Sequence, residues 1–351
     1  MRIKLPLLIL AALALALAAS LGTLRAKEGY LAPGPLPPVP VPVDNLQSDA
    51  KIRLGAQLYF DPRLSGDNTI SCATCHIPET GWAHHAATDT GIKGQVGGRN
   101  SGTIIDAAYM RVQFWDGRAG SLEEQALGPI QNPIEMGETL ENVVRKLNAI
   151  PGYRSQFQAV FDDDVTADGI AKAIASFERT IITGPSPFDL YLAGDDDAIG
   201  KPAQDGYDIF NGKAHCMACH SGPTLSDQGF HNLGVGMKKA NPDIGREAVT
   251  KAAKDRGRFK TPGLRNVAQT APYMHDGSEP TLMDVVNFYD RGGAPNKNLD
   301  PLLVPLDLTP SEKKALVAFL ESLTGPAPKV KVPKLPPDAP AEQGEEQGEQ
   351  R

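Results

Sequence analysis

The sequence predicts an all-α protein made of two similar domains that are connected by long loops. Alternating runs of β-branched residues, which would indicate strands, are rare. The 35 glycines and 30 prolines divide the chain into short segments, several of which have helical periodicity. Parts of the first half recur in order in the second half, as when Phe114-Trp115-Asp116-Gly117 returns as Met274-His275-Asp276-Gly277. The length of 351 residues accommodates about two domains of ~150 residues each.

The N-terminus has the charge pattern of an exported protein. Arg2 and Lys4 precede an apolar run over residues 5–24, and we expect residues 1–26 to be a secretory signal peptide. The alternative is an uncleaved anchor, because the run approaches the ~20 residues that span a bilayer. The sequence therefore predicts a periplasmic location, with membrane contact only if this segment is retained.

Composition divides the rest of the chain into a linker, two domains and a tail. Residues 27–44 are rich in proline and are predicted to form an extended linker. Residues 326–351 lack apolar periodicity, so we expect a disordered, solvated tail. Prolines and an acidic run interrupt the helical pattern between an N-terminal domain, residues 45–190, and a C-terminal domain, residues 191–325.

Each domain is expected to place a helix before a cysteine motif. The first helix covers Ser48 to Phe60, and its counterpart covers Ala203 to Phe210. A later helix begins at Thr309-Pro310-Ser311-Glu312, a capping box with proline at the first helical position. The apolar face of this helix consists of Leu316, Phe319, Leu320 and Leu323.

The four cysteines form two Cys-x-x-Cys pairs, and a histidine directly follows each pair. Two thiols at this spacing can form thioethers with one haem, while the histidine binds its iron. A tetrahedral zinc site needs four ligands, of which one motif supplies three, and a redox disulfide needs no histidine. The sequence therefore predicts two c-type haems. Their binding residues are Cys72, Cys75 and His76 in the first motif and Cys216, Cys219 and His220 in the second.

The acidic composition argues against nucleic-acid binding. The formal net charge is −7, and no stretch combines clustered lysines and arginines with aromatic residues. We therefore expect no DNA or RNA partner.

Each haem iron also needs a sixth ligand or an open position, and this choice separates electron transfer from catalysis. His84 and His85 follow the first motif closely enough to reach its iron if the loop folds back. Adjacent polar residues in a loop of this kind are more often solvated. Both possibilities stay open at this point.

From about residue 54 to residue 323 the sequence resembles the family of bacterial di-haem cytochrome c peroxidases and the methylamine-utilisation protein MauG. The resemblance rests on LYFDPRLS, CATCH, GGRNSGT, FWDGRAGSLEEQALGPI, IEM, SFERT, CMACH, TPGLRN, TAPYMHDG and FYDRGG. It implies two class I cytochrome c-like domains, each with one covalent haem. It also implies that peroxide reacts at the N-terminal haem, that the C-terminal haem passes or stores electrons, and that chains can pair as a homodimer.

The resemblance assigns three residues to the catalytic path. Glu135 looks like the distal acid–base group that moves a proton between the oxygens of peroxide, and Gln125 looks like its neighbour in the distal pocket. Trp115 matches the aromatic residue that carries an electron or a hole between the haems. Without these motifs, Glu135 would be read as a surface carboxylate and Trp115 as a core residue.

A calcium ion between the domains is also implied by the resemblance. Asn100, Thr270 and Pro272 match positions whose oxygens hold this ion in the family, and hard oxygen ligands suit calcium. The alternative is an ordinary turn of proline and asparagine.

The sequence departs from the peroxidase pattern at two positions. Ile92 stands where the family carries a distal histidine that blocks the first haem until reduction, so we expect an open iron unless His84 or His85 substitutes. At the position of Tyr289 the cytochrome c peroxidases carry the methionine that binds the second haem, and the tyrosine here resembles MauG. Met274 is the competing ligand in this chain. A phenolate stabilises oxidised iron, whereas a thioether favours reduced iron.

The expected function is that of a di-haem peroxidase that reacts with hydrogen peroxide at an open N-terminal haem. With Tyr289 as ligand, the resemblance favours MauG-like oxidation of a partner protein through a high-valent di-haem state. The first alternative is reduction of peroxide to water with electrons from a small cytochrome c or cupredoxin, which ligation by Met274 would favour. The second alternative is a non-catalytic di-haem electron-transfer cytochrome with two six-coordinate irons.

Overall fold

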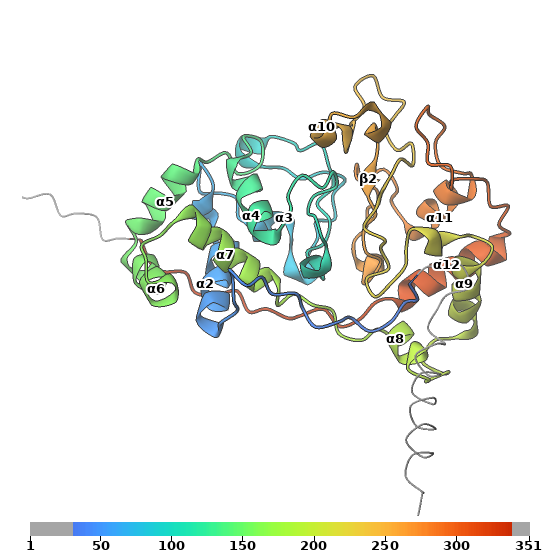
Figure 1. Cartoon of the computed structure of the whole chain (residues 1–351), viewed down its shortest axis with the longest axis horizontal. Helices are drawn as coiled ribbons and strands as arrows, with labels where there is room; N and C mark the ends of the chain where they lie inside the picture. The colour runs from blue at the N-terminus through green and yellow to red at the C-terminus, as the bar shows by residue number, and fades with distance from the viewer. Residues whose placement is uncertain (1–30, 339–351) are drawn as a thin grey trace, which may run out of the picture.

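The computed structural model describes residues 31–338, and its helices gather in two groups with long loops between them (Figure 1). The expected signal peptide, residues 1–26, lies outside the described residues. Within residues 31–338, no helix is long and apolar enough to cross a membrane. Strands in this part of the chain are limited to one antiparallel pair, β1 (Phe230–His231) and β2 (Phe259–Lys260). The prediction of a mainly helical chain is confirmed.

The helices follow the order of the two predicted domains. The N-terminal group contains α2 (Asp49–Phe60), α3 (Cys72–Cys75), α4 (Leu122–Gln131), α5 (Leu140–Asn148), α6 (Pro151–Phe161) and α7 (Ala167–Glu178). The C-terminal group contains α8 (Pro187–Leu192), α9 (Lys201–Asn211), α10 (Glu247–Thr250), α11 (Leu282–Asp290) and α12 (Pro310–Ser322). Single 3₁₀ turns lie at Pro62–Leu64, Pro78–Thr80, Ile92–Gly94, Ala107–Tyr109, Cys216–Ala218, Ala253–Asp255 and Val267–Gln269.

The same helix pair is built once in each group, around a separate hydrophobic core. In the first group α2 packs on α7, and in the second α9 packs on α12. A Cβ atom on Gly55 of α2 would lie 1.8 Å from the carbonyl oxygen of Ala173, and one on Gly206 of α9 would lie 2.0 Å from that of Ala315. Only glycine allows the backbones to approach this closely. The structure thus confirms the internal repeat.

The capping box predicted for the last helix is present. The Thr309 hydroxyl accepts a hydrogen bond from the backbone N–H of Glu312 at 3.3 Å, and the Glu312 carboxylate accepts one from the backbone N–H of Thr309 at 2.7 Å. The helix starts at Pro310 because proline fixes the helical φ where no hydrogen-bond donor is needed. The predicted apolar face of α12 is buried in the second core.

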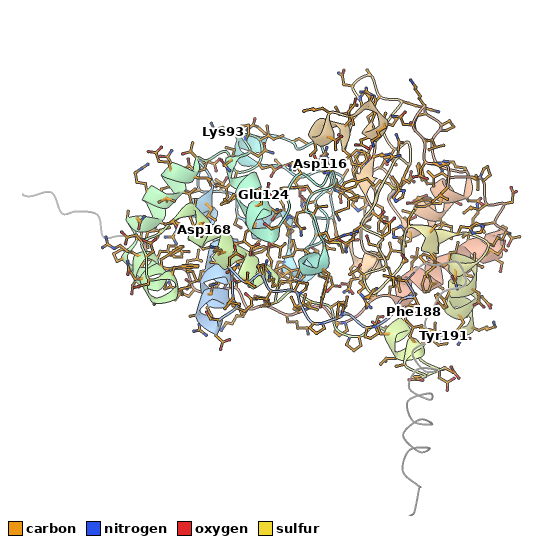
Figure 2. All side chains as sticks on the ribbon, viewed as in Figure 1. Lys93, Asp116, Glu124, Asp168, Phe188 and Tyr191 are labelled. Atoms are coloured by element: carbon orange, nitrogen blue, oxygen red, sulfur yellow. The ribbon has the colours of Figure 1, made fainter. Side chains whose placement is uncertain are left out.

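Helix α8 lies at the predicted join between the domains and packs with the C-terminal group. Phe188 and Tyr191, labelled in Figure 2, come from α8. The ring of Phe188 packs against Phe319 of α12 with centroids 5.0 Å apart, so α8 belongs to the second core. This places the start of the second helix group at Pro187, where prolines interrupt the helical pattern. The acidic run that also interrupts the pattern follows α8 at the surface.

The described part of the predicted proline-rich linker, residues 31–44, contains no helix and is bound to both domains. The carbonyl oxygen of Gly34 accepts a hydrogen bond from the guanidinium of Arg265 at 2.8 Å. The carbonyl oxygen of Pro37 accepts one from the hydroxyl of Tyr109, also at 2.8 Å. Both contacts use backbone carbonyl oxygens, which a proline-rich segment keeps although its prolines have no N–H donor. Residues 31–44 therefore connect the two domains.

The prediction of a solvated tail is wrong for residues 326–338. This segment returns from α12 along the N-terminal group, where the carbonyl oxygen of Lys334 accepts a hydrogen bond from Gln57 at 3.0 Å (Figure 1). Val330 packs against the first core. An extended segment can bury single side chains without the periodicity that marks a helix, which explains why composition missed it. The expected tail continues through residues 339–351, which lie outside the described residues.

Candidate haem and peroxide site

One cavity of about 870 Å³ is lined by residues of both domains. Its wall is mainly apolar, and its volume lies near the upper end of the ~300–1,000 Å³ typical of ligand and cofactor sites. The predicted site residues on its wall are Cys72, Cys75, His76, Asn100, Trp115, Gln125, Glu135, Cys216, Cys219, His220, Thr270, Pro272, Met274 and Tyr289. The structure therefore brings together residues that are far apart in the sequence. The remaining three residues singled out above, His84, His85 and Ile92, do not line this cavity.

The two motif histidines are held in the same way. The Nδ1 atom of His76 lies 2.9 Å from the carbonyl oxygen of Gly102, and that of His220 lies 3.0 Å from the carbonyl oxygen of Leu225. A carbonyl only accepts hydrogen bonds, so each Nδ1 carries the proton and each Nε2 keeps a free lone pair. Burial lowers the pKa of both imidazoles, which favours the neutral form that binds iron. This is the arrangement of a proximal haem ligand.

The motif cysteines present half-buried thiols to the cavity. Cys72 and Cys75 bound the short helix α3, and Cys216 begins a 3₁₀ turn. Burial raises the pKa of Cys75 and Cys216 to about 12, so their thiolates are disfavoured and these residues are poor free metal ligands. A pair of thiols and a neutral imidazole on one apolar wall fit a c-type haem at each motif.

Glu135 lies on the cavity wall in the loop after α4, on the side of the first motif. Its Oε1 atom accepts a hydrogen bond from the amide of Asn132 at 2.7 Å. Burial raises the pKa of Glu135, and the carboxylate of Asp89 adds to this effect, while Arg118 opposes it. Gln125 reaches the same cavity from α4. This wall can therefore hold and move a proton.

The three residues considered for the distal position of the first haem are engaged elsewhere. Ile92 is only 4% exposed, and its backbone N–H donates to the carbonyl oxygen of Glu135 at 2.9 Å. The Nδ1 atom of His84 lies 2.6 Å from the Asp89 carboxylate, and the Nε2 atom of His85 lies 3.0 Å from a backbone carbonyl oxygen. The partner of His84, Asp89, itself lines the cavity, whereas Gln269, the partner of His85, does not. In this structure neither takes the position of an iron ligand.

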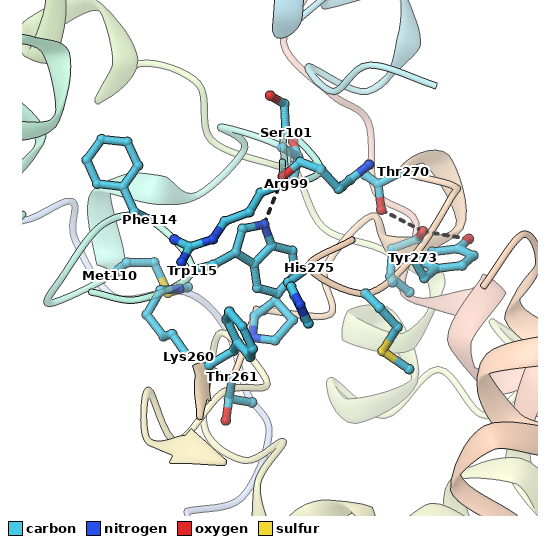
Figure 3. A pocket seen from close by; sticks show the side chains of 18 of the residues that line it. Arg99, Ser101, Met110, Phe114, Trp115, Lys260, Thr261, Thr270, Tyr273 and His275 are labelled. Atoms are coloured by element: carbon cyan, nitrogen blue, oxygen red, sulfur yellow. Dashed lines mark hydrogen bonds between the residues drawn. The ribbon is translucent and has the colours of Figure 1, made fainter. Parts of the chain in front are cut away.

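Trp115 is fixed between the two domains. Its indole N–H donates to the carbonyl oxygen of Asn100 at 2.8 Å, and its own carbonyl oxygen accepts from the backbone N–H of Lys260 at 2.7 Å (Figure 3). The indole meets the ring of His275 edge to face, with centroids 6.4 Å apart. His275 in turn stacks on Phe259 at 3.6 Å with an interplanar angle of 13°. Burial lowers the pKa of His275 to about 4, so the cluster is uncharged.

The sequence interpretation missed the parts played by His275 and Phe259. A usable signal was present, because the repeat places His275 at the position of Trp115. The sequence did not indicate that the two rings meet, since this contact requires the two repeats to face each other.

An ion-pair network holds the domains together around this cluster. The guanidinium of Arg99 binds the carboxylate of Asp243 at 2.6 Å and that of Asp116 at 2.7 Å. The guanidinium of Arg246 donates to the carbonyl oxygens of Asp116 and Gly117, both at 2.8 Å. Since Asp243 and Arg246 come from the C-terminal domain, these contacts fix how the aromatic cluster sits between the domains.

Both candidate ligands of the second haem face the cavity. Tyr289 lies in α11, and Met274 lies in the turn before it with φ of 72°. Burial raises the pKa of the Tyr289 hydroxyl, and the nearby thiols of Cys216 and Cys219 raise it further. No described residue hydrogen-bonds to this hydroxyl. Tyr289 therefore places an unpartnered phenol next to the second motif.

The candidate calcium ligands supply uncharged oxygens. Asn100 is 6% exposed, and its side-chain amide donates to the carbonyl oxygen of Ala86 at 3.0 Å. The hydroxyl of Thr270 donates to a backbone carbonyl at 3.0 Å and keeps its lone pairs for a cation. With Pro272, these residues offer fewer oxygens than the ~6–8 that calcium takes, so water would have to complete the shell.

His231 was not given a role from the sequence, yet it lies beside the second motif. Its ring bridges the carboxylates of Asp227 at 2.9 Å and Asp300 at 2.7 Å. The hydrogen bond to Asp227 contributes most to a pKa of about 11, so this imidazole is protonated. Cys219, Asp227 and His231 are spaced closely enough for a metal ion, but Cys219 is the thiol expected to attach the haem. We therefore assign the cluster to the surroundings of the second haem.

Comparison with known proteins agrees with this geometry. The family described as di-haem cytochrome c peroxidase matches residues 49–197. The cytochrome-c peroxidase IdrP1 of Pseudomonas sp. (strain SCT) is 40% identical over 321 residues, covering 83% of this chain and 85% of the relative. The methylamine utilization protein MauG of Methylorubrum extorquens is 39% identical over 302 residues, covering 85% of both chains. The solved structure of a MauG-like protein associated with microbial copper homeostasis has a TM-score of 0.77 at 34% identity, covering 84% of this chain and 94% of that one.

The chain belongs to the di-haem cytochrome c peroxidase and MauG family. This membership makes it a di-haem oxidoreductase of the peroxidase class and sets aside the alternative of a non-catalytic electron carrier. Relatives named as peroxidases and as MauG match at nearly equal identity. Similarity alone therefore does not separate these two activities.

Proposed function

We propose that this chain is a periplasmic di-haem enzyme that reacts with hydrogen peroxide at its N-terminal haem and oxidises a partner protein, as MauG-type proteins do. Each domain then corresponds to a class I cytochrome c unit, with one haem attached by the cysteines of its motif. The haems supply the redox centres when bound. Reduction of one peroxide to two waters takes two electrons and two protons, and the partner protein supplies the electrons.

The unpartnered Tyr289 hydroxyl is the observation that carries the MauG-like proposal. The Tyr289 side chain is half-buried and lines the cavity, so a group that occupies the cavity can become the partner of its hydroxyl. An iron at the second motif would be such a partner, because this hydroxyl lies near the sulfur atoms of Cys216 and Cys219. A phenolate ligand stabilises the oxidised state of a haem. A haem with such a ligand would keep its oxidising equivalents until the partner protein binds and donates electrons.

Glu135 performs the proton transfer in this proposal. The carboxylate accepts a proton from bound peroxide and returns it to the oxygen that leaves as water, so no net charge accumulates. Its raised pKa suits both steps, because the group is neither a very weak base nor a very strong acid. The Asn132 amide fixes one carboxylate oxygen, and Gln125 lies on the same wall to orient the substrate.

Electron movement between the domains follows the aromatic cluster. Trp115, His275 and Phe259 form a continuous set of rings at the interface, with Trp115 tied by hydrogen bonds to both domains. The low pKa of His275 keeps its ring neutral, so the imidazole itself adds no positive charge that would oppose a passing hole. The proposed direction is from the partner protein to the C-terminal haem and then to the N-terminal haem.

A second candidate is a peroxidase that receives its electrons from a small cytochrome c or a cupredoxin. The observation in its favour is that Met274 also lines the cavity. A thioether on the second iron would raise its potential and favour electron uptake from such donors.

Adding hydrogen peroxide to the fully ferric protein without reductant tests the proposal. We expect a prompt change in the absorption bands and spin states of both haems. A response that appears only after one haem is reduced would establish the cytochrome-fed peroxidase instead. The Ile92→His variant is the matched control, because a histidine in that position is expected to create a form that needs prior reduction.

Calcium and pairing of chains complete the proposal. Asn100, Thr270 and Pro272 would hold a calcium ion next to Trp115, whose indole binds the carbonyl of Asn100. Removal of calcium by a chelator should then slow electron transfer between the haems, and added calcium should restore it.

Sedimentation of the holoprotein tests the proposed homodimer.

A further inference from the structure

Lys260 places an ammonium group on the wall of the cavity that both motifs share. The residue ends strand β2, and its backbone N–H donates to the carbonyl oxygen of Trp115 at 2.7 Å. Figure 3 shows Lys260 on the wall that also carries Trp115 and His275. The backbone of Lys260 is thus anchored at the domain interface, and its side chain lines the cavity there.

The Lys260 ammonium differs from the other cations of this wall because it has no anionic partner. Burial is the only influence on its pKa, which falls to about 8, and no described carboxylate contributes. The other cations on the wall are paired, namely Arg99 with Asp243 at 2.6 Å, Arg118 with Asp116 at 3.1 Å, Arg265 with Asp189 at 2.7 Å and His231 with Asp300 at 2.7 Å. A buried charge without a partner is strongly unfavourable. Lys260 is half-buried and lines the cavity, so a group that fills the cavity would remove water from this ammonium and would have to bring the anion.

We propose that Lys260 binds a propionate carboxylate of a haem in this cavity. Every haem carries two such carboxylates, and a charge-assisted hydrogen bond from an ammonium is among the stronger polar contacts in proteins. The inference rests on the two haems of the proposed function. It adds a positioning residue for one haem edge at the point where Trp115 joins the domains.

Comparison of Lys260 with the equivalent position of the first repeat indicates the effect of an ammonium–propionate pair. The backbone N–H of Lys260 donates to the carbonyl oxygen of Trp115, and the backbone N–H of Asn100 donates to that of His275 at 2.8 Å. Asn100 and Lys260 therefore hold matching places on the two sides of the interface, one neutral and one cationic. A cation next to one propionate makes that haem easier to reduce than its counterpart. Lys260 thus makes the two otherwise similar haem sites electrostatically unequal.

The test is a potentiometric titration of both haems in the holoprotein, comparing the wild type with Lys260→Met. We expect the equilibrium constant for reduction of one haem to fall about tenfold, which lowers its reduction potential by ~59 mV for one electron. The potential of the other haem should shift less. The haem whose potential shifts, identified by its spin state, is the haem whose propionate Lys260 binds. Lys254→Met, at an exposed position of the same domain, is the matched control and should change neither potential.

A second variant covers the case in which Lys260→Met loses haem. Lys260→Arg keeps the charge and changes the hydrogen-bond geometry, so we expect a shifted propionate bending band of one haem in resonance Raman spectra with its potential nearly retained. Unchanged potentials in Lys260→Met, or an unchanged band in Lys260→Arg, in protein with both haems attached would overturn the assignment of Lys260 alone. Absence of covalent haem from the wild type would instead overturn the proposed function.

Discussion

The rings of Trp115 and His275 occupy equivalent positions of the two repeats and meet edge to face at the domain interface, 6.4 Å apart. The backbone contacts around them are equally matched, because Lys260 donates to the carbonyl of Trp115 and Asn100 donates to that of His275. Each repeat thus donates a backbone hydrogen bond from an equivalent position to the aromatic residue of the other repeat. The interface that the proposed electron path crosses is therefore built from equivalent positions of the two repeats.

Replacing Trp115 with phenylalanine should leave both haems attached and uncouple them. The smaller ring loses the hydrogen bond to Asn100 and the edge contact with His275. We expect the second haem to respond to peroxide about tenfold more slowly, which corresponds to ~1.4 kcal/mol of activation free energy. Stopped-flow spectra of the two haems measure this. Trp82→Phe is the control, because Trp82 is buried in the first core and does not line the cavity.

Glu135→Gln should keep the haem spectra and slow the reaction with peroxide by ~10²–10⁴-fold, the usual contribution of a general acid–base group. Glu141→Gln, at an exposed position of α5, should have no such effect. Burial raises the pKa of Glu135, and the ionised form is the proton acceptor. The rate should therefore fall as the pH drops through a value above the ordinary glutamate pKa. Equal rates for Glu135→Gln and the wild type would remove the assigned role.

Tyr289→Phe and Met274→Leu form a matched pair that decides the ligand of the second haem. If the phenol binds iron, Tyr289→Phe changes the absorption bands, spin state and reduction potential of that haem, and Met274→Leu does not. The physical reason is that only loss of a ligand atom alters the coordination of iron. The reverse result would favour the cytochrome-fed peroxidase.

Glu178 should make the holoprotein less stable as the pH rises. Its Oε2 atom is buried without a partner, and burial raises the pKa of Glu178 to about 8. Between the ordinary pKa and this value the folded state holds a proton that the unfolded state has released, so the free energy of unfolding falls by up to ~1.4 kcal/mol per pH unit. Urea midpoints from pH 5 to 8 measure the slope. Glu178→Gln should flatten the slope, and an identical slope in both proteins would show that Glu178 ionises normally.

Alanine at either interhelical glycine should destabilise the corresponding domain. A methyl group on Gly55 or Gly206 would overlap a backbone carbonyl of the facing helix, which side-chain rotation cannot relieve. We expect a loss of ~1–3 kcal/mol in the free energy of unfolding, typical of an overpacked core. Gly34→Ala is the control, since nothing lies within 4 Å of a Cβ atom at that position. Thermal unfolding of the three variants provides the comparison.

The sequence by itself determined the local features of this protein. The spacing of Cys72, Cys75 and His76 depends on one helical turn, so it can be read without knowledge of the fold. The same holds for the start of α12, where Thr309 and Glu312 satisfy each other's backbone N–H groups. Short-range geometry specifies such features, and short segments contain all the atoms involved.

Only the tertiary structure decided which distant segments meet. Residues 326–338 read as a solvated tail because an extended segment has no helical pattern, yet Val330 packs on the first core. No feature of the sequence distinguishes Lys260 from the other lysines, and its position on the cavity wall without a described anionic partner depends on the folded structure. The contact of Trp115 with His275 likewise requires the two repeats to face each other. Burial and pairing depend on atoms supplied by remote parts of the chain, and the pattern of neighbouring residues does not encode them.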